Sequence, residues 1–147
     1  MDILPQFMAY AGDFERTLAD DDWSRLERYF ADDAVYEVGP PLACRLAGRA
    51  AIFAGIRKSL NGLDRKFTRR DVAVTSGPDI SGDEMRLGWQ VTYFKDGQPP
   101  YVLRGRSTVR YAGDAIVYLA DAYDPAVTDE LAAYQRQTGI ALDPSYT

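Results

Sequence analysis

The hydrophobic pattern of the chain changes its period near the middle. Residues 3–19 carry apolar side chains every three or four positions, at Phe7, Tyr10, Ala11, Phe14 and Leu18. This spacing is typical of a helix with one buried face. Residues 49–60 repeat it and are followed by Asn-Gly, a common helix stop. A shorter helix is predicted between them, because Asp22 is a good N-cap for the residues that follow. The first half therefore predicts three helices.

The second half alternates between apolar and polar positions with a period of two, as strands do. It predicts four strands, at residues 66–76, 84–95, 100–112 and 115–124. The stretches between them are rich in turn-forming residues. The remaining segments are a short strand at 34–38, a proline-containing loop at 39–48 and a last helix at 125–139. This order predicts an α+β domain, in which the three helices of the N-terminal half cover one face of a curved antiparallel sheet.

Composition and charge narrow the class of protein. The chain has 147 residues, of which 46% are hydrophobic and 27% charged, and this fits one domain over residues 1–147 that buries its own core. Its net charge of -5 argues against a nucleic-acid partner, because such binding rests on a basic surface. No stretch approaches the roughly 20 apolar residues that cross a bilayer, and the first residues do not resemble a signal peptide. We therefore expect a cytoplasmic protein without a membrane partner.

The sequence contains no histidine and a single cysteine, Cys44. Histidine is the commonest general base and metal ligand, so its absence excludes Ser-His and Cys-His nucleophile pairs. The sequence also lacks a phosphate-binding Gly-x-Gly-x-x-Gly segment and a helical carboxylate cluster at metal-ligand spacing. We expect neither a metal nor an organic cofactor, which leaves carboxylates, tyrosines and arginines for any chemistry.

The segment VYLADAYD, at residues 117–124, places an acid on an apolar strand face. Alternation puts Asp121 on the same side as Val117, Leu119 and Tyr123. A buried carboxylate without a partner is costly or has a raised pKa. Two interpretations stay open: Asp121 performs acid-base chemistry in a cavity, or it is hydrogen-bonded to a tyrosine or an arginine and only shapes the wall.

Several aromatic residues are candidates for the wall of such a cavity. Their rings suit an apolar or aromatic small molecule, and their polar tips can hydrogen-bond it. The candidates are Tyr36, Trp89, Tyr93 and Tyr123.

The order of elements resembles the NTF2-like superfamily, which includes ketosteroid isomerase, limonene epoxide hydrolase and the SnoaL-like polyketide cyclases. The matching segments are DDWSRLERYFADDAVYE, LAGRAAIFAGI and IVYLADAYD, and the resemblance covers most of residues 7–124. It implies a cone-shaped fold with an apolar cavity between the sheet and the helices. The fold carries isomerases, dehydratases, hydrolases and non-catalytic binding modules, so it implies the place of the site and not the activity.

The members of this superfamily differ in their catalytic residues, which can be compared with this sequence one position at a time. The base, the tyrosine and the protonated acid of ketosteroid isomerase fall on Val38, Phe14 and about Ser107, so none of the three groups is present. Limonene epoxide hydrolase and the SnoaL-like cyclases have a carboxylate in the final strand, and Asp121 matches it. The companion Arg-x-Asp pair of the hydrolase is only partly present, because Arg86 lacks the acid that should follow it.

Two functions are therefore predicted. The first is a cofactor-free small-molecule enzyme of the isomerase, dehydratase or cyclase type, which uses Asp121 for acid-base chemistry. The alternative is a non-catalytic small-molecule-binding or accessory module of the same fold. The resemblance and the polar sheet face also predict a homodimer. That face would carry Arg86, Gln90, Thr92, Arg104, Arg106 and Thr108.

Overall fold

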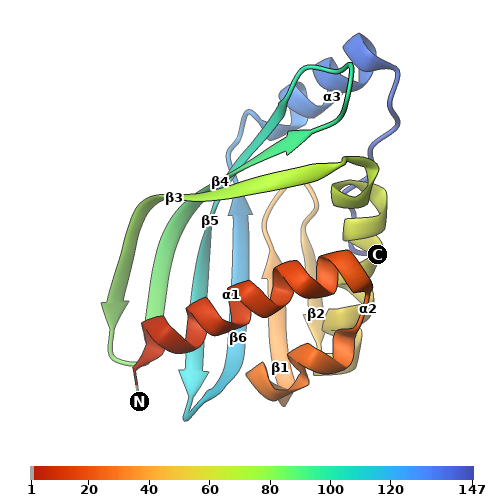
Figure 1. The fold of residues 1–147 in the computed structure, drawn as a ribbon. Coiled ribbons are helices and arrows are strands. Elements are labelled where there is room, and N and C mark those ends of the chain that lie inside the picture. The colour runs from red at the N-terminus through yellow and green to blue at the C-terminus, as the bar shows by residue number, and fades with distance from the viewer. Residues whose placement is uncertain (1) are drawn as a thin grey trace.

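One curved sheet of six strands forms the frame of the molecule (Figure 1). The computed structural model describes residues 2–147. The strands are β1 (Phe30–Val38), β2 (Cys44–Ala47), β3 (Arg69–Ser81), β4 (Glu84–Phe94), β5 (Tyr101–Ala112) and β6 (Ala115–Tyr123). Their order across the sheet is β2-β1-β6-β5-β4-β3. Strands β3 to β6 form the predicted antiparallel meander, while β1 runs parallel to β6.

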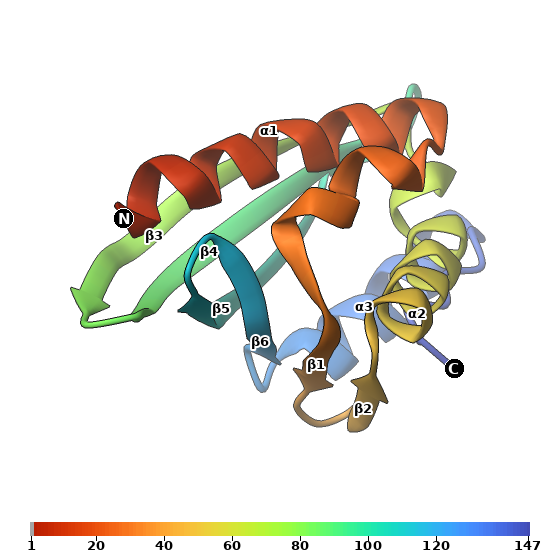
Figure 2. The same cartoon turned by 90° about the horizontal axis from the view of Figure 1, so that it is seen from below.

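Helices cover one face of this sheet, which we call the inner face. The helices are α1 (Ile3–Asp20), the 3-10 helix η1 (Trp23–Tyr29), α2 (Arg49–Gly62), the short 3-10 helix η2 (Asp64–Lys66) and α3 (Val127–Thr138). Helix α1 crosses the inner face, with η1 and α2 beside it (Figures 1 and 2). The expected cover of three helices from the N-terminal half is therefore confirmed, and α3 lies at the end of the β4–β5 hairpin.

The predicted second helix is a 3-10 helix, and the strand after it begins earlier than expected. Trp23, Leu26 and Tyr29 are spaced by three residues, which suits the three residues per turn of a 3-10 helix. Strand β1 then starts at Phe30 rather than at residue 34. Pairing with β6 begins at this residue, so tertiary contact extends the strand beyond its apolar pattern.

Two further strand boundaries differ from the sequence pattern. The predicted loop at 39–48 contains β2, which pairs antiparallel with β1. Its two prolines lie in the turn, where they remove no hydrogen bond from the sheet. Strand β3 continues through a predicted turn to Ser81, and shifts of register on either side of Ser76 accommodate this. Such irregularities are tolerated in β3 because it is an edge strand.

Two groups of buried side chains fill the space between the sheet and the helices. The first lies under α1, η1 and α2 and includes Tyr10, Leu26, Tyr36, Ile52, Met85, Val109, Ile116 and Tyr146. The second lies towards α3 and includes Leu63, Phe67, Val91, Tyr93, Tyr101, Leu103, Tyr134 and Leu142. Residues 139–147, which form neither helix nor strand, contribute a side chain to each group.

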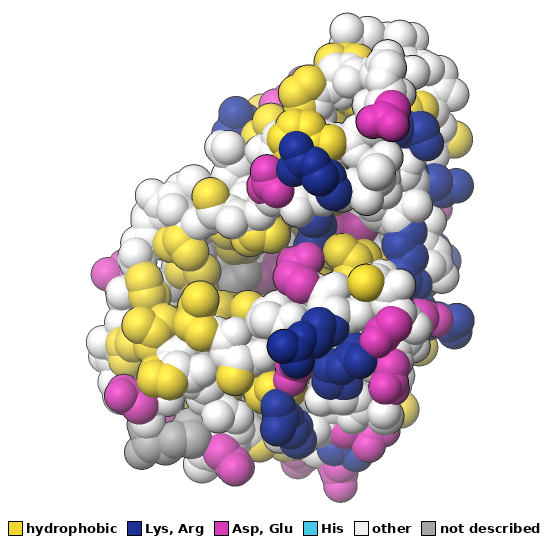
Figure 3. All heavy atoms as spheres, viewed as in Figure 1, with side chains coloured by type: hydrophobic (Ala, Val, Ile, Leu, Met, Phe, Trp, Pro, Cys, Tyr) yellow, Lys and Arg dark blue, Asp and Glu magenta, His cyan; other side chains and the backbone are white. Residues whose placement is uncertain are grey.

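Some hydrophobic side chains stay exposed near the edge strand. They are Leu4 and Met8 of α1 and Val72, Val74 and Ile80 of β3. Figure 3 shows hydrophobic side chains gathered over this side of the molecule. Helix α1 packs against β4, which leaves the neighbouring edge strand accessible. None of the described helices is long and apolar enough to span a membrane.

Candidate functional site

Asp121 lies near the end of β6 and directs its carboxylate towards the inner face of the sheet. Register places it opposite Ser107 of β5 and next to Val38 of β1. One carboxylate oxygen accepts a hydrogen bond from the Ser107 hydroxyl and the other from the Tyr36 hydroxyl, each at 2.5 Å. Both oxygens are therefore held by neutral O–H donors.

Aromatic side chains hold these two donors in turn. The indole N–H of Trp89 donates to the Ser107 hydroxyl oxygen at 2.8 Å. The hydroxyl oxygen of Tyr36 lies 3.2 Å from that of Tyr146, which is 2.8 Å from that of Tyr123. We call this connected set the Asp121 network; its members are Asp121, Tyr36, Ser107, Trp89, Tyr123 and Tyr146.

The direction of the hydrogen bonds in the network follows from counting protons. A tyrosine hydroxyl has a single proton, and that of Tyr36 is used in the shorter bond to Asp121. When Asp121 is ionised and holds that proton, the Tyr36–Tyr146 contact is a hydrogen bond only with Tyr146 as the donor, and this leaves Tyr123 as the donor to the Tyr146 oxygen. The three hydroxyls form a chain in which each proton points towards the carboxylate.

Burial dominates the electrostatics of the network. It raises the pKa of Asp121 above its ordinary value, and the hydrogen bonds from Ser107 and Tyr36 oppose this shift without cancelling it. Burial also raises the pKa of Tyr123, and it raises the pKa of Tyr146 to about 12. At neutral pH these hydroxyls stay protonated, so the carboxylate of Asp121 is the proton acceptor of the network.

Tyr93 belongs to a different polar group, although it also faces inward. Its hydroxyl donates to the Asp64 carboxylate at 2.8 Å. Arg70 pairs with the same carboxylate at 2.7 Å and with Glu15 at 2.5 Å. Of the four predicted wall residues, three therefore gather around Asp121, while Tyr93 completes a buried ion pair.

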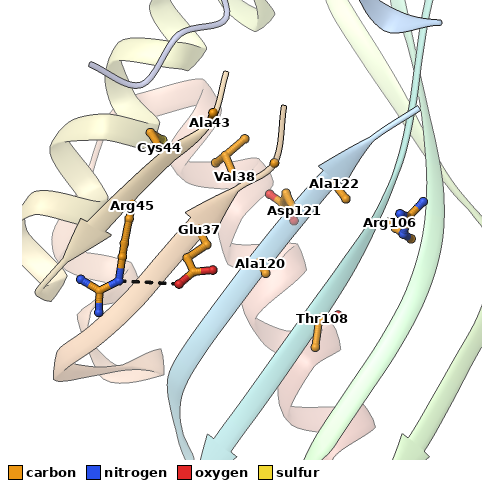
Figure 4. A pocket seen from close by; sticks show the side chains of 11 residues that line it. Glu37, Val38, Ala43, Cys44, Arg45, Arg106, Thr108, Ala120, Asp121 and Ala122 are labelled. Atoms are coloured by element: carbon orange, nitrogen blue, oxygen red, sulfur yellow. Dashed lines mark ion pairs between the residues drawn. The ribbon is translucent and has the colours of Figure 1, made fainter. Parts of the chain in front are cut away.

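A hollow of about 530 Å³ lies on the outer face of the sheet (Figure 4). Its lining comes mainly from outward-facing positions such as Arg106 and Thr108, and Arg45 and Glu37 form an ion pair of 3.6 Å beside it. Asp121 borders this hollow, but its carboxylate oxygens are bonded to inner-face hydroxyls. The hollow is therefore separate from the chemistry of the Asp121 network.

The comparisons with known proteins agree with this architecture. The family model of the SnoaL-like domain matches residues 11–119. The chain belongs to the SnoaL-like domain family. The NTF2-like fold expected from the sequence is thereby confirmed, since SnoaL-like domains are members of that superfamily. No curated protein matches the sequence.

Solved structures of low identity share the fold of this SnoaL-like domain. A protein from Catenulispora acidiphila with a ketosteroid isomerase-like fold, in complex with trimethylamine, is 17% identical, with a TM-score of 0.61 and coverage of 94% of this chain and 96% of that one. TerC, co-crystallised with polyporic acid, is 14% identical, with a TM-score of 0.64 and coverage of 88% and 97%. An NTF2-like protein from Exiguobacterium sp. 255-15 is 19% identical, with a TM-score of 0.63 and coverage of 82% and 98%.

Sequence reasoning missed two members of the network of this SnoaL-like domain. Ser107 was identified only as the place where the acid of ketosteroid isomerase is absent, although its inward position between Leu103 and Val109 follows from strand alternation. Tyr146 has no comparable signal, because it lies in a segment without periodic structure.

The inside of the cone is occupied by side chains. Tyr36 and Tyr146 are 2% and 9% exposed, and Ile52 and Met85 of the same buried group are fully buried. The wide apolar cavity that the resemblance implies is thus filled in this arrangement, with Tyr146 among the groups that fill it. Within residues 2–147, no cluster of three or more acidic or cysteine side chains is arranged to hold a metal ion.

Proposed function

We propose that this SnoaL-like domain is an enzyme that transfers a proton within a small apolar or aromatic ring compound. The reaction would be of the isomerase, dehydratase or cyclase type and would need no cofactor. One observation carries the proposal: the Asp121 carboxylate faces the inside of the cone, where burial raises its pKa, and it is held by two neutral hydroxyls, with no cation from residues 2–147 paired with it. Buried charges are normally paired with an opposite charge, as Asp64 is with Arg70.

Asp121 has the properties that a general acid-base group needs. Its raised pKa brings proton exchange closer to neutral pH than an ordinary carboxylate allows. In an isomerisation, the carboxylate would accept a proton from a carbon next to a carbonyl group and return it at a second carbon. The proton taken from the first carbon is the one delivered to the second, so Asp121 ends the reaction ionised, as it began. The charge that develops on the carbonyl oxygen would be stabilised by a tyrosine hydroxyl of the network.

The chemistry of the surrounding side chains supports an apolar or aromatic ligand. Trp89 and Tyr123 pack edge to face, with ring centroids 6.0 Å apart, and Tyr36 adds a third ring with a polar tip. Such walls stack on rings and hydrogen-bond carbonyl or hydroxyl oxygens. The fold neighbour TerC was co-crystallised with polyporic acid, which is consistent with an organic ligand for this fold.

The alternative is a non-catalytic module that binds a small molecule. It is favoured by the absence of the ketosteroid-isomerase groups at Phe14 and Val38, and by the filled inside of the cone. In this case Asp121 would serve as a hydrogen-bond acceptor for the ligand. The two functions differ in whether the bound compound is consumed.

The experiment starts from native mass spectrometry of the purified protein mixed with a cell extract, which identifies a retained compound. Turnover of that compound is then measured for the natural chain and for Asp121→Asn. Loss of proton transfer predicts a rate lower by about 10²-fold or more, with the protein still folded.

Asp13→Asn is the matched control: Asp13 is a second buried acid, bonded to Tyr29 and Arg28, and its replacement should spare the rate per folded molecule. Normal turnover by Asp121→Asn would end the catalytic proposal, and a compound that binds without being consumed would favour the alternative.

A further inference from the structure

The segment after α3, residues 139–147, closes one side of the Asp121 network. It runs beside α2 (Figures 1 and 2) and has neither helix nor strand. Through it, Tyr146 enters the network. The other rings of the network stand on strands of the sheet: Tyr36 on β1, Trp89 on β4 and Tyr123 on β6. Tyr146 is therefore the ring of the network that the sheet does not fix.

Few interactions attach this segment to α2. The Ser59 hydroxyl donates to the carbonyl oxygen of Pro144 at 2.6 Å, and the Lys58 ammonium to the Ser145 hydroxyl at 2.8 Å. The backbone N–H of Asp143 donates to the carbonyl oxygen of Gly62 at 3.0 Å. Leu142 and Tyr146 are the buried side chains that anchor the segment to the core. Segments with so few buried contacts open at a lower free energy than the core does.

The side chain of Tyr146 has the position and the chemistry of a ligand. Its ring meets that of Tyr36 edge to face, with centroids 5.5 Å apart. Its hydroxyl lies 3.2 Å from that of Tyr36 and 2.8 Å from that of Tyr123; with the Tyr36 proton on an ionised Asp121, it accepts from Tyr123 and donates to Tyr36. A compound that reaches this carboxylate from the same side must therefore take over these contacts.

We propose that residues 139–147 act as a plug, that Tyr146 occupies the place of the substrate, and that the substrate is a phenolic or enolic ring compound that displaces it. This inference rests on the proposed function and names the substrate class of the same site. A ring hydroxyl can accept from Tyr123 and donate to Tyr36 as the phenol does, so the exchange conserves both hydrogen bonds. An unsubstituted hydrocarbon ring can make neither.

Gly62 offers a way to lift the plug without replacing any residue of the network. A Cβ atom built on Gly62 would overlap with the carbonyl oxygen of Asp143 and would lie 2.9 Å from its carbonyl carbon. Gly62→Ala should therefore push the segment away, while alanine suits the last turn of α2. Gly12→Ala is the matched control, because Gly12 is also helical and nothing lies within 4 Å of its added Cβ. Tyr146→Ala empties the same place by truncation and serves as a second test.

The probes are 2-naphthol, which carries a ring hydroxyl, and naphthalene, which does not. If the natural chain spends most of its time closed, its apparent affinity is reduced by the small open fraction. Isothermal titration should therefore show 2-naphthol binding at least about 10-fold tighter to Gly62→Ala and to Tyr146→Ala than to the natural chain or Gly12→Ala. Naphthalene should bind every protein more weakly than 2-naphthol. In the natural chain, 2-naphthol should speed hydrogen exchange of the Asp143 amide, whose bond to Gly62 breaks when the plug leaves.

Several results would overturn the plug. These are equal affinity of Gly62→Ala and Gly12→Ala, equal binding of naphthalene and 2-naphthol, or no binding of 2-naphthol to any variant. If Gly62→Ala does not fold, the same comparison is made with Tyr146→Ala. Binding of 2-naphthol with the Asp143 amide still protected would reject the plug and leave the proposed function standing. Tight binding of 2-naphthol to Gly62→Ala together with normal turnover of the retained compound by Asp121→Asn would keep the plug and end the catalytic role of Asp121.

Discussion

Replacing Asp121 with asparagine should change how the stability of the protein depends on pH. Folding raises the pKa of this carboxyl because burial disfavours its charge. The unfolded chain therefore loses the Asp121 proton at a lower pH than the folded chain does. As pH rises from the unfolded pKa, near 3.8, through the raised folded pKa, the free energy of unfolding falls. Below the unfolded pKa no part of this loss is present, and above the folded pKa it is complete.

The size of the effect follows from the shift itself. Each unit by which folding raises the pKa lowers the free energy of unfolding by about 1.4 kcal/mol at a pH above both values. Asparagine has nearly the same shape and does not titrate, so the free energy of unfolding of Asp121→Asn lacks the pH dependence that Asp121 causes. The difference between the two proteins isolates Asp121, because all other titrating groups are shared. Between the unfolded and the folded pKa of Asp121, the free energy of unfolding of Asp121→Asn should rise relative to that of the natural chain by up to about 1.4 kcal/mol per pH unit.

Urea denaturation at intervals between about pH 4 and pH 8 measures this difference. Asp13→Asn is the control, because hydrogen bonds from Tyr29 and Arg28 lower the pKa of Asp13. The stability that Asp13 contributes is fully present well above its unfolded pKa, so its difference from the natural chain should be flat from about pH 5 upward. A flat difference for Asp121→Asn as well, or a loss of its relative stability with rising pH, would refute a raised pKa at Asp121.

Three further predictions concern neighbouring features. Tyr36→Phe removes one donor from the Asp121 carboxylate and should lower the free energy of unfolding by about 1–3 kcal/mol in urea at neutral pH; an unchanged value would contradict the bond. Arg70→Met leaves Asp64 buried without its cation and should cost about 3–5 kcal/mol, and clearly less when Asp64→Asn is already present; equal costs in both backgrounds would argue against the pair. We propose that the chain forms a homodimer through the outer face of the sheet, so light scattering at micromolar concentration should give twice the chain mass, and Arg106→Glu should lower it; a monomer mass for the natural chain would reject this.

Local pattern was enough to predict the elements that carry their own periodic signal. Helices α1 and α2 and strands β4 to β6 are long, and their buried faces repeat at the helical or strand period. Strand β2 has only four residues and is a strand because β1 lies beside it, which no local pattern records. The start of β1 was missed for a related reason: Asp32 and Asp33 interrupt its apolar pattern, and the strand reaches back to Phe30 through the pairing of this residue with Ile116 of β6, across an irregularity that ends at Val35.

The residues of the candidate site that belong to strands could be predicted in part from the sequence. Alternation along β6 indicated that Asp121 faces inward, and Tyr36 is an inward residue of a strand that pairs with β6. Register between strands, which sets Ser107 opposite Asp121, needs the assembled sheet. Tyr146 is 110 residues from Tyr36 along the chain, and its segment has no regular structure, so only tertiary packing reveals their contact.

The hydrogen bonds around Asp121 also determine which ligands the site can accept. In the closed arrangement the Tyr123 hydroxyl donates to Tyr146, so removal of Tyr146 leaves that proton without an acceptor inside an apolar surrounding. A ring compound without an oxygen would keep it unpaired, at a cost of about 1–3 kcal/mol. A ring hydroxyl restores the bond, which corresponds to a preference of about 5-fold to 150-fold. The same contacts that keep a buried carboxylate tolerable in the closed protein therefore select hydroxyl-bearing rings over plain hydrocarbons, and they bring the hydroxyl of such a ring to the Tyr36 oxygen, one hydrogen bond away from Asp121.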